Sequence, residues 1–189
     1  MDRKIPELTL EIRNNSGAHI FYLTKQTQLY LDNIVVFILD GLKNDDNVLI
    51  VENKRLTPLI QQRIHSILTD QELAKVHFFD SFTFYWQKGS FLPSEIVNHF
   101  SEEGVASSLA HQRFRTWGHI EWGSQEDMEE ELILYEENVD QLITASNLIA
   151  VCAYDADRLE NSLQNRLQKY HDYLMRDDQI IVCQSMRKM

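Results

Sequence analysis

Residues 148–157 read L-I-A-V-C-A-Y-D-A-D and indicate how this chain is built. The run is apolar as far as Tyr154 and then turns polar at Asp155, which is typical of a buried strand in an α/β protein. Ligands of such proteins bind beyond the carboxyl ends of the parallel strands. The polar groups that end this run are therefore candidates for a ligand site.

Two segments upstream extend the same pattern. Residues 113–122 read R-F-R-T-W-G-H-I-E-W and predict a short strand over 118–122, reached through arginines. Residues 132–142 read L-I-L-Y-E-E-N-V-D-Q-L and predict an amphipathic helix. Further strand patterns occupy 19–23, 47–52, 76–80 and 180–183, and further helical patterns occupy 26–41, 57–68, 93–110 and 157–174.

This alternation predicts right-handed βαβ crossovers and a mainly parallel sheet. The fold class is therefore α/β with three layers and helices on both faces of the sheet. A chain of 189 residues with 43% hydrophobic residues is large enough for one well-buried core. We expect an N-terminal extension over 1–16 and a single domain over 17–189.

Composition narrows the class of protein. The chain has 29 acidic and 18 basic residues, and its net charge of -11 disfavours direct binding to nucleic acid. It has no apolar run of the ~20 residues needed to span a membrane and no export signal, so we expect a cytoplasmic protein. Cys152 and Cys183 both lie in apolar runs, so we expect two buried, reduced thiols and no disulfide.

The sequence lacks the motifs of a nucleotide-hydrolysing enzyme. Residues 24–28 follow the first strand and read T-K-Q-T-Q, without the glycines and the Lys-Ser/Thr pair of a Walker A loop. No nucleophile elbow, Ser-His-Asp pattern or Cys-His pair is assignable. We therefore expect no enzyme activity and no cofactor.

Some residues of the chain are of types that could form a metal site or an anion site. His19 and His119 could bind a metal with Glu52 or Glu136, but no tight ligand spacing supports this, and the sequence predicts no metal. Arg115 could hold an anionic ligand, or it could pair with an acid such as Glu136.

The strand ends and the amphipathic helix supply the remaining candidates. Apart from ligand binding, such residues also serve as helix caps and turn residues. We expect several of them to meet near one end of the sheet, with an Arg115–Glu136 pair as the wall of a pocket. The full set of candidate ligand-binding residues is His19, Tyr22, Glu52, Asn53, Asp80, Arg115, His119, Trp122, Tyr135, Glu136, Tyr154 and Asp155.

These pieces, taken in order, resemble the methanogen/methylotroph sensory (MEDS) domain family. Two departures stand out: His119 occupies the place of a family glutamate, and the pair 171–172 is His-Asp where the family tends to have His-Pro. The matching motifs are His19 to Leu23, Gly41-Leu42, Val48 to Glu52, the aromatic segment with Tyr85, Gly89, Phe91 and Pro93, then Arg115, Gly118 to Trp122, Tyr135-Glu136 and Cys152 to Asp155.

The resemblance implies a RecA/KaiC-like fold that has lost its nucleotide loop. It also implies sensing of small molecules, such as hydrocarbon derivatives, beside kinase or DNA-binding output domains. A chain of this length leaves no room for such an output, so we expect a stand-alone bacterial or archaeal regulator. Its partner would be a signalling protein, either a kinase or a transcription regulator, and a homo-oligomer remains open.

Two other functions compete with the sensor. One is a pure protein-interaction antagonist with a vestigial pocket, and the other is an uncharacterised enzyme on a degenerate ATPase scaffold. A strand edge closed by side chains would favour the interaction module. A roomy cavity with converging polar groups would favour the sensor.

Overall fold

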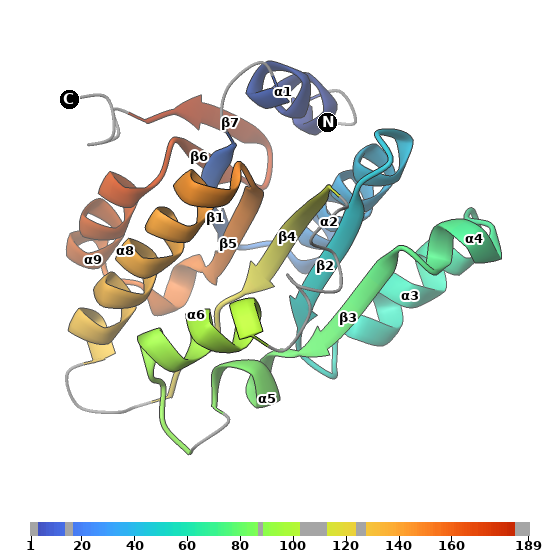
Figure 1. The fold of residues 1–189 in the computed structure, drawn as a ribbon. Helices are drawn as coiled ribbons and strands as arrows, with labels where there is room; N and C mark the ends of the chain where they lie inside the picture. The colour runs from blue at the N-terminus through green and yellow to red at the C-terminus, as the bar shows by residue number, and fades with distance from the viewer. Residues whose placement is uncertain (1–3, 14–16, 87–88, 103–112, 124–127, 184–189) are drawn as a thin grey trace.

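The computed structural model describes residues 4–13, 17–86, 89–102, 113–123 and 128–183 (Figure 1). Within these residues the sheet has seven strands in the order β3-β2-β4-β5-β1-β6-β7. All neighbours are parallel except β6 and β7, which form an antiparallel hairpin at one edge. The strands are β1 (Ala18–Thr24), β2 (Asn47–Glu52), β3 (Val76–Asp80), β4 (Phe114–His119), β5 (Ile149–Asp155), β6 (Tyr173–Arg176) and β7 (Gln179–Val182).

Helices cover both faces of the sheet, which confirms the predicted three-layer α/β architecture. In Figure 1, α8, α9 and α6 lie in front of the sheet and α2 lies behind it. The helices are α1 (Lys4–Arg13), α2 (Thr27–Lys43), α3 (Thr57–His65), α4 (Asp70–Leu73), α5 (Ser81–Tyr85), α6 (Pro93–Glu102), α8 (Met128–Ser146) and α9 (Asn161–Leu167), with short 3₁₀ turns at η1 (Ala156–Arg158) and η2 (Gln168–Tyr170).

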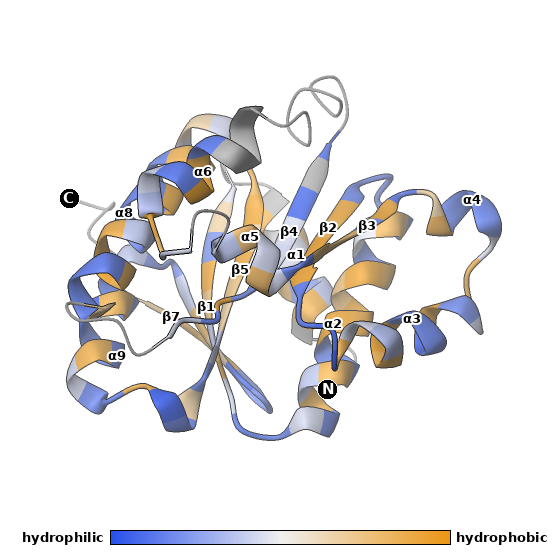
Figure 2. Cartoon of the chain, turned by 90° about the horizontal axis from the view of Figure 1, so that it is seen from below, coloured by the Kyte–Doolittle hydropathy of each residue, from blue (hydrophilic) through white to orange (hydrophobic). Residues whose placement is uncertain are grey.

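Each face of the sheet has its own hydrophobic core. Every residue of β1 and β2 is buried, because helices cover both faces of these strands. Successive side chains alternate between the faces. Ile20 and Tyr22 belong to the core under α1, α2 and α3, whereas Phe21 and Leu23 belong to the core under α5, α6, α8 and α9. In Figure 2, β2, β3 and β5 are mostly hydrophobic, and the helices on either side of them have mixed hydrophobic and hydrophilic residues.

The two edge strands of the sheet, β3 and β7, are both partly exposed. β3 has only partly buried residues, and at the opposite edge Ile181 and Val182 of β7 are 46% and 59% exposed.

The N-terminal segment also contributes to the core, since Ile5, Leu8 and Ile12 of α1 are buried against α2. No helix among the described residues is long and apolar enough to cross a membrane.

Two predicted elements were wrong in their bounds, and one strand was missed. The fourth strand is Phe114–His119 and not 118–122. The predicted helix over 157–174 is instead η1, α9 and η2, followed by strand β6, which pairs with β1. The last strand therefore runs antiparallel to β6 and is the seventh of the described strands. The part of the predicted helix 93–110 that lies beyond residue 102 falls outside the described residues.

Candidate functional site

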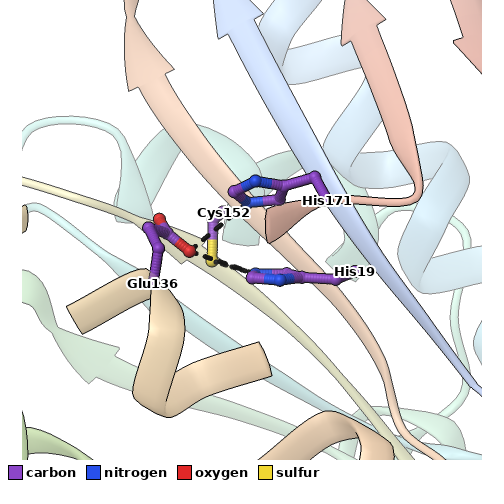
Figure 3. Close-up of side chains that lie close together, drawn as sticks. All are labelled: His19, Glu136, Cys152 and His171. Carbon is purple, nitrogen blue, oxygen red and sulfur yellow. Dashed lines mark hydrogen bonds and ion pairs between the residues drawn. The ribbon is translucent and has the colours of Figure 1, made fainter. Parts of the chain in front are cut away.

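Four side chains with metal-ligating atoms meet inside the core on the α8 side of the sheet (Figure 3). His19 comes from β1, Cys152 from β5, Glu136 from α8 and His171 from the turn before β6. His19 Nε2 lies 3.1 Å from Glu136 Oε2 and 3.3 Å from Cys152 Sγ. His171 Nε2 lies 3.3 Å from the same carboxylate oxygen. We call these four residues the buried cluster.

A second ring of contacts fixes the orientation of the buried cluster. The Tyr154 hydroxyl donates to the other carboxylate oxygen, Glu136 Oε1. His19 Nδ1 lies 3.0 Å from the Tyr170 carbonyl and 3.3 Å from Asp140 Oδ1. His171 Nδ1 lies 2.8 Å from the Leu167 carbonyl. Main-chain oxygens therefore hold both imidazoles through Nδ1, and both Nε2 atoms face Glu136 Oε2 at the centre of the buried cluster.

Burial and charge act in opposite directions on the buried cluster. Burial opposes ionisation of Glu136, but His171 and His19 outweigh it and lower the pKa of the carboxyl group. Burial likewise opposes a charge on His19, but the acidic neighbours Cys152, Asp140 and Glu136 raise its pKa above the ordinary value. Burial and the positive charge of His19 lower the pKa of His171. Burial raises the pKa of the Cys152 thiol to about 12.

A separate polar cluster closes the carboxyl edge of the sheet. The fully buried Glu52 accepts hydrogen bonds from Tyr30 Oη at 2.5 Å and from the Asn53 amide at 2.7 Å, and it lies 2.8 Å from His119 Nδ1. Trp117 Nε1 in turn donates to the Tyr30 hydroxyl. These groups satisfy one another, so the edge at β2 and β4 is filled by side chains.

The His119–Glu52 pair predicts a specific pH dependence of stability. Burial opposes a proton on His119, but the hydrogen bond and charge of Glu52 raise its pKa above the ordinary value of ~6.5. A group whose pKa is raised in the folded state stabilises the fold fully at pH values below its unfolded-state pKa. This stabilisation is lost as the pH rises through its folded-state pKa. We expect the free energy of unfolding to fall less between pH 6 and pH 8.5 in His119→Gln than in the parent. Urea titrations across this range measure the difference, and parallel curves for the two proteins would contradict it.

The turn after β1 lies where a nucleotide-binding protein of this topology would hold phosphate. The amides of Lys25 and Gln26 both donate to Asp177 Oδ2 at 2.9 Å, and Tyr22 Oη and Thr24 Oγ1 donate to Asp177 Oδ1 at 2.8 and 3.0 Å. A carboxylate from the β6–β7 turn thus takes the main-chain donors that a phosphate would need. Tyr22 is therefore part of this internal bond network.

We expect this chain not to bind ATP–Mg at micromolar concentration. Its turn lacks the Walker A glycines, and Asp177 both occupies the amides and repels a phosphate. Isothermal titration calorimetry with ATP–Mg measures this directly, and a saturable heat at micromolar nucleotide would contradict the expectation. Asp177→Asn removes the repelling charge and serves as the comparison.

The structure contains an apolar cavity of about 50 Å³ between the sheet and helices α6 and α8. Leu49 and Ala150 of the sheet line it, together with Val139 and Tyr135 of α8, and Cys152 of the buried cluster reaches its wall. A water molecule needs only ~10–15 Å³ of such volume, so the cavity admits a molecule of several heavy atoms.

A second hollow is lined mainly by polar residues. Its volume is about 70 Å³, and it lies at the carboxyl edge of the sheet beside Thr24, Lys25 and His119. Its polar lining makes it a poorer site for a weakly polar molecule than the cavity under α8.

The predicted pocket wall does not form. Arg115 lies inside β4, where it binds Asp40 Oδ2 at 2.9 Å and Asp46 Oδ2 at 2.7 Å on the α2 side of the sheet. Glu136 lies on the opposite face, in the buried cluster. Their predicted pairing was wrong because β4 begins earlier than expected, which turns Arg115 towards α2.

The other predicted site residues divide between capping, stacking and the two clusters. Asp80 and Asp155 cap α5 and η1 by accepting amide hydrogen bonds from Thr83 and Asp157. The remaining placements are these: Asn53 bonds Glu121, Trp122 stacks under Arg158, Tyr135 packs on Tyr85 and Phe91, Glu52 and His119 form the carboxyl-edge cluster, and His19, Glu136 and Tyr154 meet at the buried cluster.

Two members of the buried cluster were missed as site residues. Cys152 and Cys183 are both buried and free, which confirms the prediction for these thiols. Cys152 of β5 pairs with Phe21 of the neighbouring strand β1, two residues after His19. His171 lay within a predicted helix, and only its true position before β6 brings it beside His19. One signal in the sequence could have revealed part of the cluster. Side chains alternate between the two faces along a strand, and this alternation places His19 and Cys152 on the same side of the sheet.

Solved structures share this fold at very low sequence identity. One solved ATPase domain matches with a TM-score of 0.55 and 9% identity, over 85% of this chain and 69% of that chain. A protein from Pyrococcus horikoshii OT3 matches with the same score and identity, over 96% of this chain and 92% of that one. No curated protein matches significantly. These likenesses show that the α/β fold is shared and no more.

The family is decided by sequence. The model described as "MEDS: MEthanogen/methylotroph, DcmR Sensory domain" matches residues 18–172, from the first residue of β1 to the residue after His171. This range contains all four residues of the buried cluster and most of the sheet. The chain therefore belongs to the MEDS family of sensory domains.

Proposed function

We propose that this domain senses a small, weakly polar molecule that enters the apolar cavity under α8. The observation that carries the proposal is the cavity itself, which lies in a domain of a sensory family. Its lining is almost entirely aliphatic and aromatic, so it suits a short hydrocarbon derivative better than a charged metabolite. Family membership supports a sensory and regulatory role, and the ligand class rests on the cavity.

The cavity touches groups that could report its occupancy. Tyr135 lines it, and the next residue on α8 is Glu136. Cys152 belongs both to the cavity wall and to the buried cluster. A ligand that favours one position of α8 would shift the domain between two states, to the extent that its affinity for them differs. A signalling partner, a kinase or a transcription regulator, would then read the position of α8.

Filling the cavity tests this function. We expect short-chain alcohols and ketones, and xenon as an apolar probe, to shift amide resonances of residues that line the cavity. Val139→Phe should abolish these shifts because the larger ring occupies the space. The control is Leu134→Phe on the same helix, since Leu134 is 46% exposed and does not line the cavity. Equal shifts in both variants, or none in the parent, would sink the proposal.

A second function, a pure protein-interaction module, is favoured by the polar contacts at the carboxyl edge. Glu52, His119 and Asn53 satisfy one another there, which leaves a polar hollow of about 70 Å³ beside Thr24 and Lys25 and, within the described part of the chain, no apolar cavity at the strand ends. The edge strand β7 exposes Ile181 and Val182 and could pair with a strand of a partner. Capture of the same signalling protein from native cells by the parent and by Val139→Phe, but not by Ile181→Asp, would favour this function over sensing.

A further inference from the structure

Apart from the Cys152 thiol, which keeps its proton until a metal displaces it, the inner atoms of the buried cluster are electron-pair donors once the ring protons are placed. The carbonyls of Tyr170 and Leu167 can only accept hydrogen bonds, so His19 Nδ1 and His171 Nδ1 carry the protons. In the neutral rings both Nε2 atoms then present lone pairs, and they face Glu136 Oε2 at 3.1 and 3.3 Å. Such an arrangement is stable only with a cation or an extra proton at its centre.

Two atoms of the buried cluster show this need directly. Glu136 Oε2 and His171 Nε2 are fully buried, and neither makes a hydrogen bond of good geometry to a described residue; the contacts of Glu136 Oε2 with His19 Nε2 and His171 Nε2, at 3.1 and 3.3 Å, are ion pairs only when a ring is protonated. Both atoms point into the space between the four side chains (Figure 3). Buried polar atoms without a partner are rare and call for a physical explanation.

We propose that His19, Glu136, Cys152 and His171 bind one divalent transition-metal ion, with zinc as the best fit. Metal bonds of ~2.0–2.3 Å at tetrahedral angles place the ligand atoms about 3.3–3.7 Å from one another. Three of the six separations here are 3.1, 3.3 and 3.3 Å, and all four ligand atoms lie within 4.8 Å of each other. The space is therefore of the right size for a four-coordinate ion.

Charge and ligand type also select this class of ion. Two neutral imidazoles, a carboxylate and a thiolate sum to a charge of −2, so a divalent cation makes the buried site neutral and limits its desolvation cost. A thiolate with two imidazoles suits zinc and disfavours calcium and magnesium, which take oxygen ligands. The carbonyls on both Nδ1 atoms and the Tyr154 hydroxyl on Glu136 are the outer contacts that metal ligands usually have.

One adjustment accompanies binding. The rings of His19 and His171 lie with centroids 3.8 Å apart and an interplanar angle of 33°. At least one ring therefore turns about its Cβ–Cγ bond so that both lone pairs meet the ion. With four protein ligands the ion has no open position, so it stabilises or reports and does not activate water. It would tie β1, β5 and α8 to the turn before β6.

Zinc titration of the chelator-stripped, reduced full chain tests the proposal, with a chromophoric chelator as competitor. We expect one ion per chain at micromolar affinity or tighter. Cys152→Ser and His171→Gln should each weaken binding by at least roughly 10–100-fold, the loss that follows removal even of an outer contact. The controls are Cys183→Ser and His119→Gln, which remove a buried cysteine and a buried histidine outside the buried cluster and should leave the affinity unchanged.

X-ray absorption at the zinc edge of the parent protein removes any dependence on how the variants fold. We expect one sulfur and three nitrogen or oxygen neighbours. Cobalt substitution should give a thiolate-to-cobalt charge-transfer band that Cys183→Ser retains. Absence of micromolar binding, a shell without sulfur, or affinity that survives Cys152→Ser would overturn the site and leave a proton-sharing cluster in its place. This test does not depend on a ligand in the apolar cavity, so the proposed sensing function stands or fails separately.

Discussion

Arg115→Met is expected to lower the free energy of unfolding by about 3–5 kcal/mol, the usual cost of removing one partner from a fully buried ion pair. The Arg115 guanidinium is fully buried, and it binds Asp40 through Nη1 and Asp46 through Nε and Nη2. Methionine keeps much of the volume of the side chain, so the loss would come from the two buried carboxylates, of which Asp40 loses its guanidinium and Asp46 keeps only the exposed Arg113. Urea unfolding of the parent and the variant measures it.

The neighbouring arginine provides a matched control. Arg113 Nε lies 3.4 Å from the same Asp46, but the side chain of Arg113 is 66% exposed. Arg113→Met should therefore cost less than about 1 kcal/mol, as surface ion pairs do. Adding Asp40→Asn and Asp46→Asn to Arg115→Met should recover part of the loss, since uncharged amides no longer need the guanidinium. A loss of about 1 kcal/mol or less for Arg115→Met would show that water reaches this site.

Gly41 explains how the arginine fits. The sequence suggested that the helix ends at Gly41, but α2 ends at Lys43, with Asn44 as its C-cap. A Cβ atom on Gly41 would lie 3.0 Å from Arg115 Cδ and 2.8 Å from Val48. The glycine is therefore needed for the close approach of α2 to β4, a reason that the local sequence does not reveal.

Most of the fold was accessible from sequence because its strands are buried on both faces. Apolar runs such as 47–52 and 148–154 are strong signals, since only a doubly covered strand excludes polar residues from both sides. The order of strands and helices then limits the topology to a mainly parallel sheet. The antiparallel hairpin at the edge was missed because β6 is only four residues long and follows a helical pattern.

The fourth strand was misplaced for a physical reason. Charge normally excludes an arginine from a covered strand, so the sequence was read as if β4 began after Arg115. The two aspartates that neutralise Arg115 come from α2 and from the turn before β2, 75 and 69 residues earlier in the chain. No local pattern contains that information. The same holds for His171, whose partners come from β1 and α8.

Besides the His119–Glu52 pair, the described part of the sheet has a buried ionic centre on each face that joins the sheet to a helix. Arg115 links β4 to α2, whereas His19, with Glu136, links β1 to α8. Both centres are fully buried, so each is costly to break and contributes to a single arrangement of its helix. They differ in chemistry: the first holds permanent charges, whereas the second consists of groups that titrate and is the site that we propose for a metal ion.

Glu136→Ala is expected to lower the free energy of unfolding by about 3–5 kcal/mol in chelator-treated protein. The change removes the shared partner of His19, His171 and the Tyr154 hydroxyl, all of which stay fully buried. Alanine is the better helix former, so the loss cannot come from helix propensity. The next residue gives the control: Glu137 is exposed, and Glu137→Ala should change stability by less than about 0.5 kcal/mol. Glu136→Gln should fall between the two, because its amide oxygen can still accept from Tyr154. Urea unfolding of the three variants ranks them, and a Glu136→Ala loss no larger than that of Glu137→Ala would mean that the carboxylate does not hold α8 to β1.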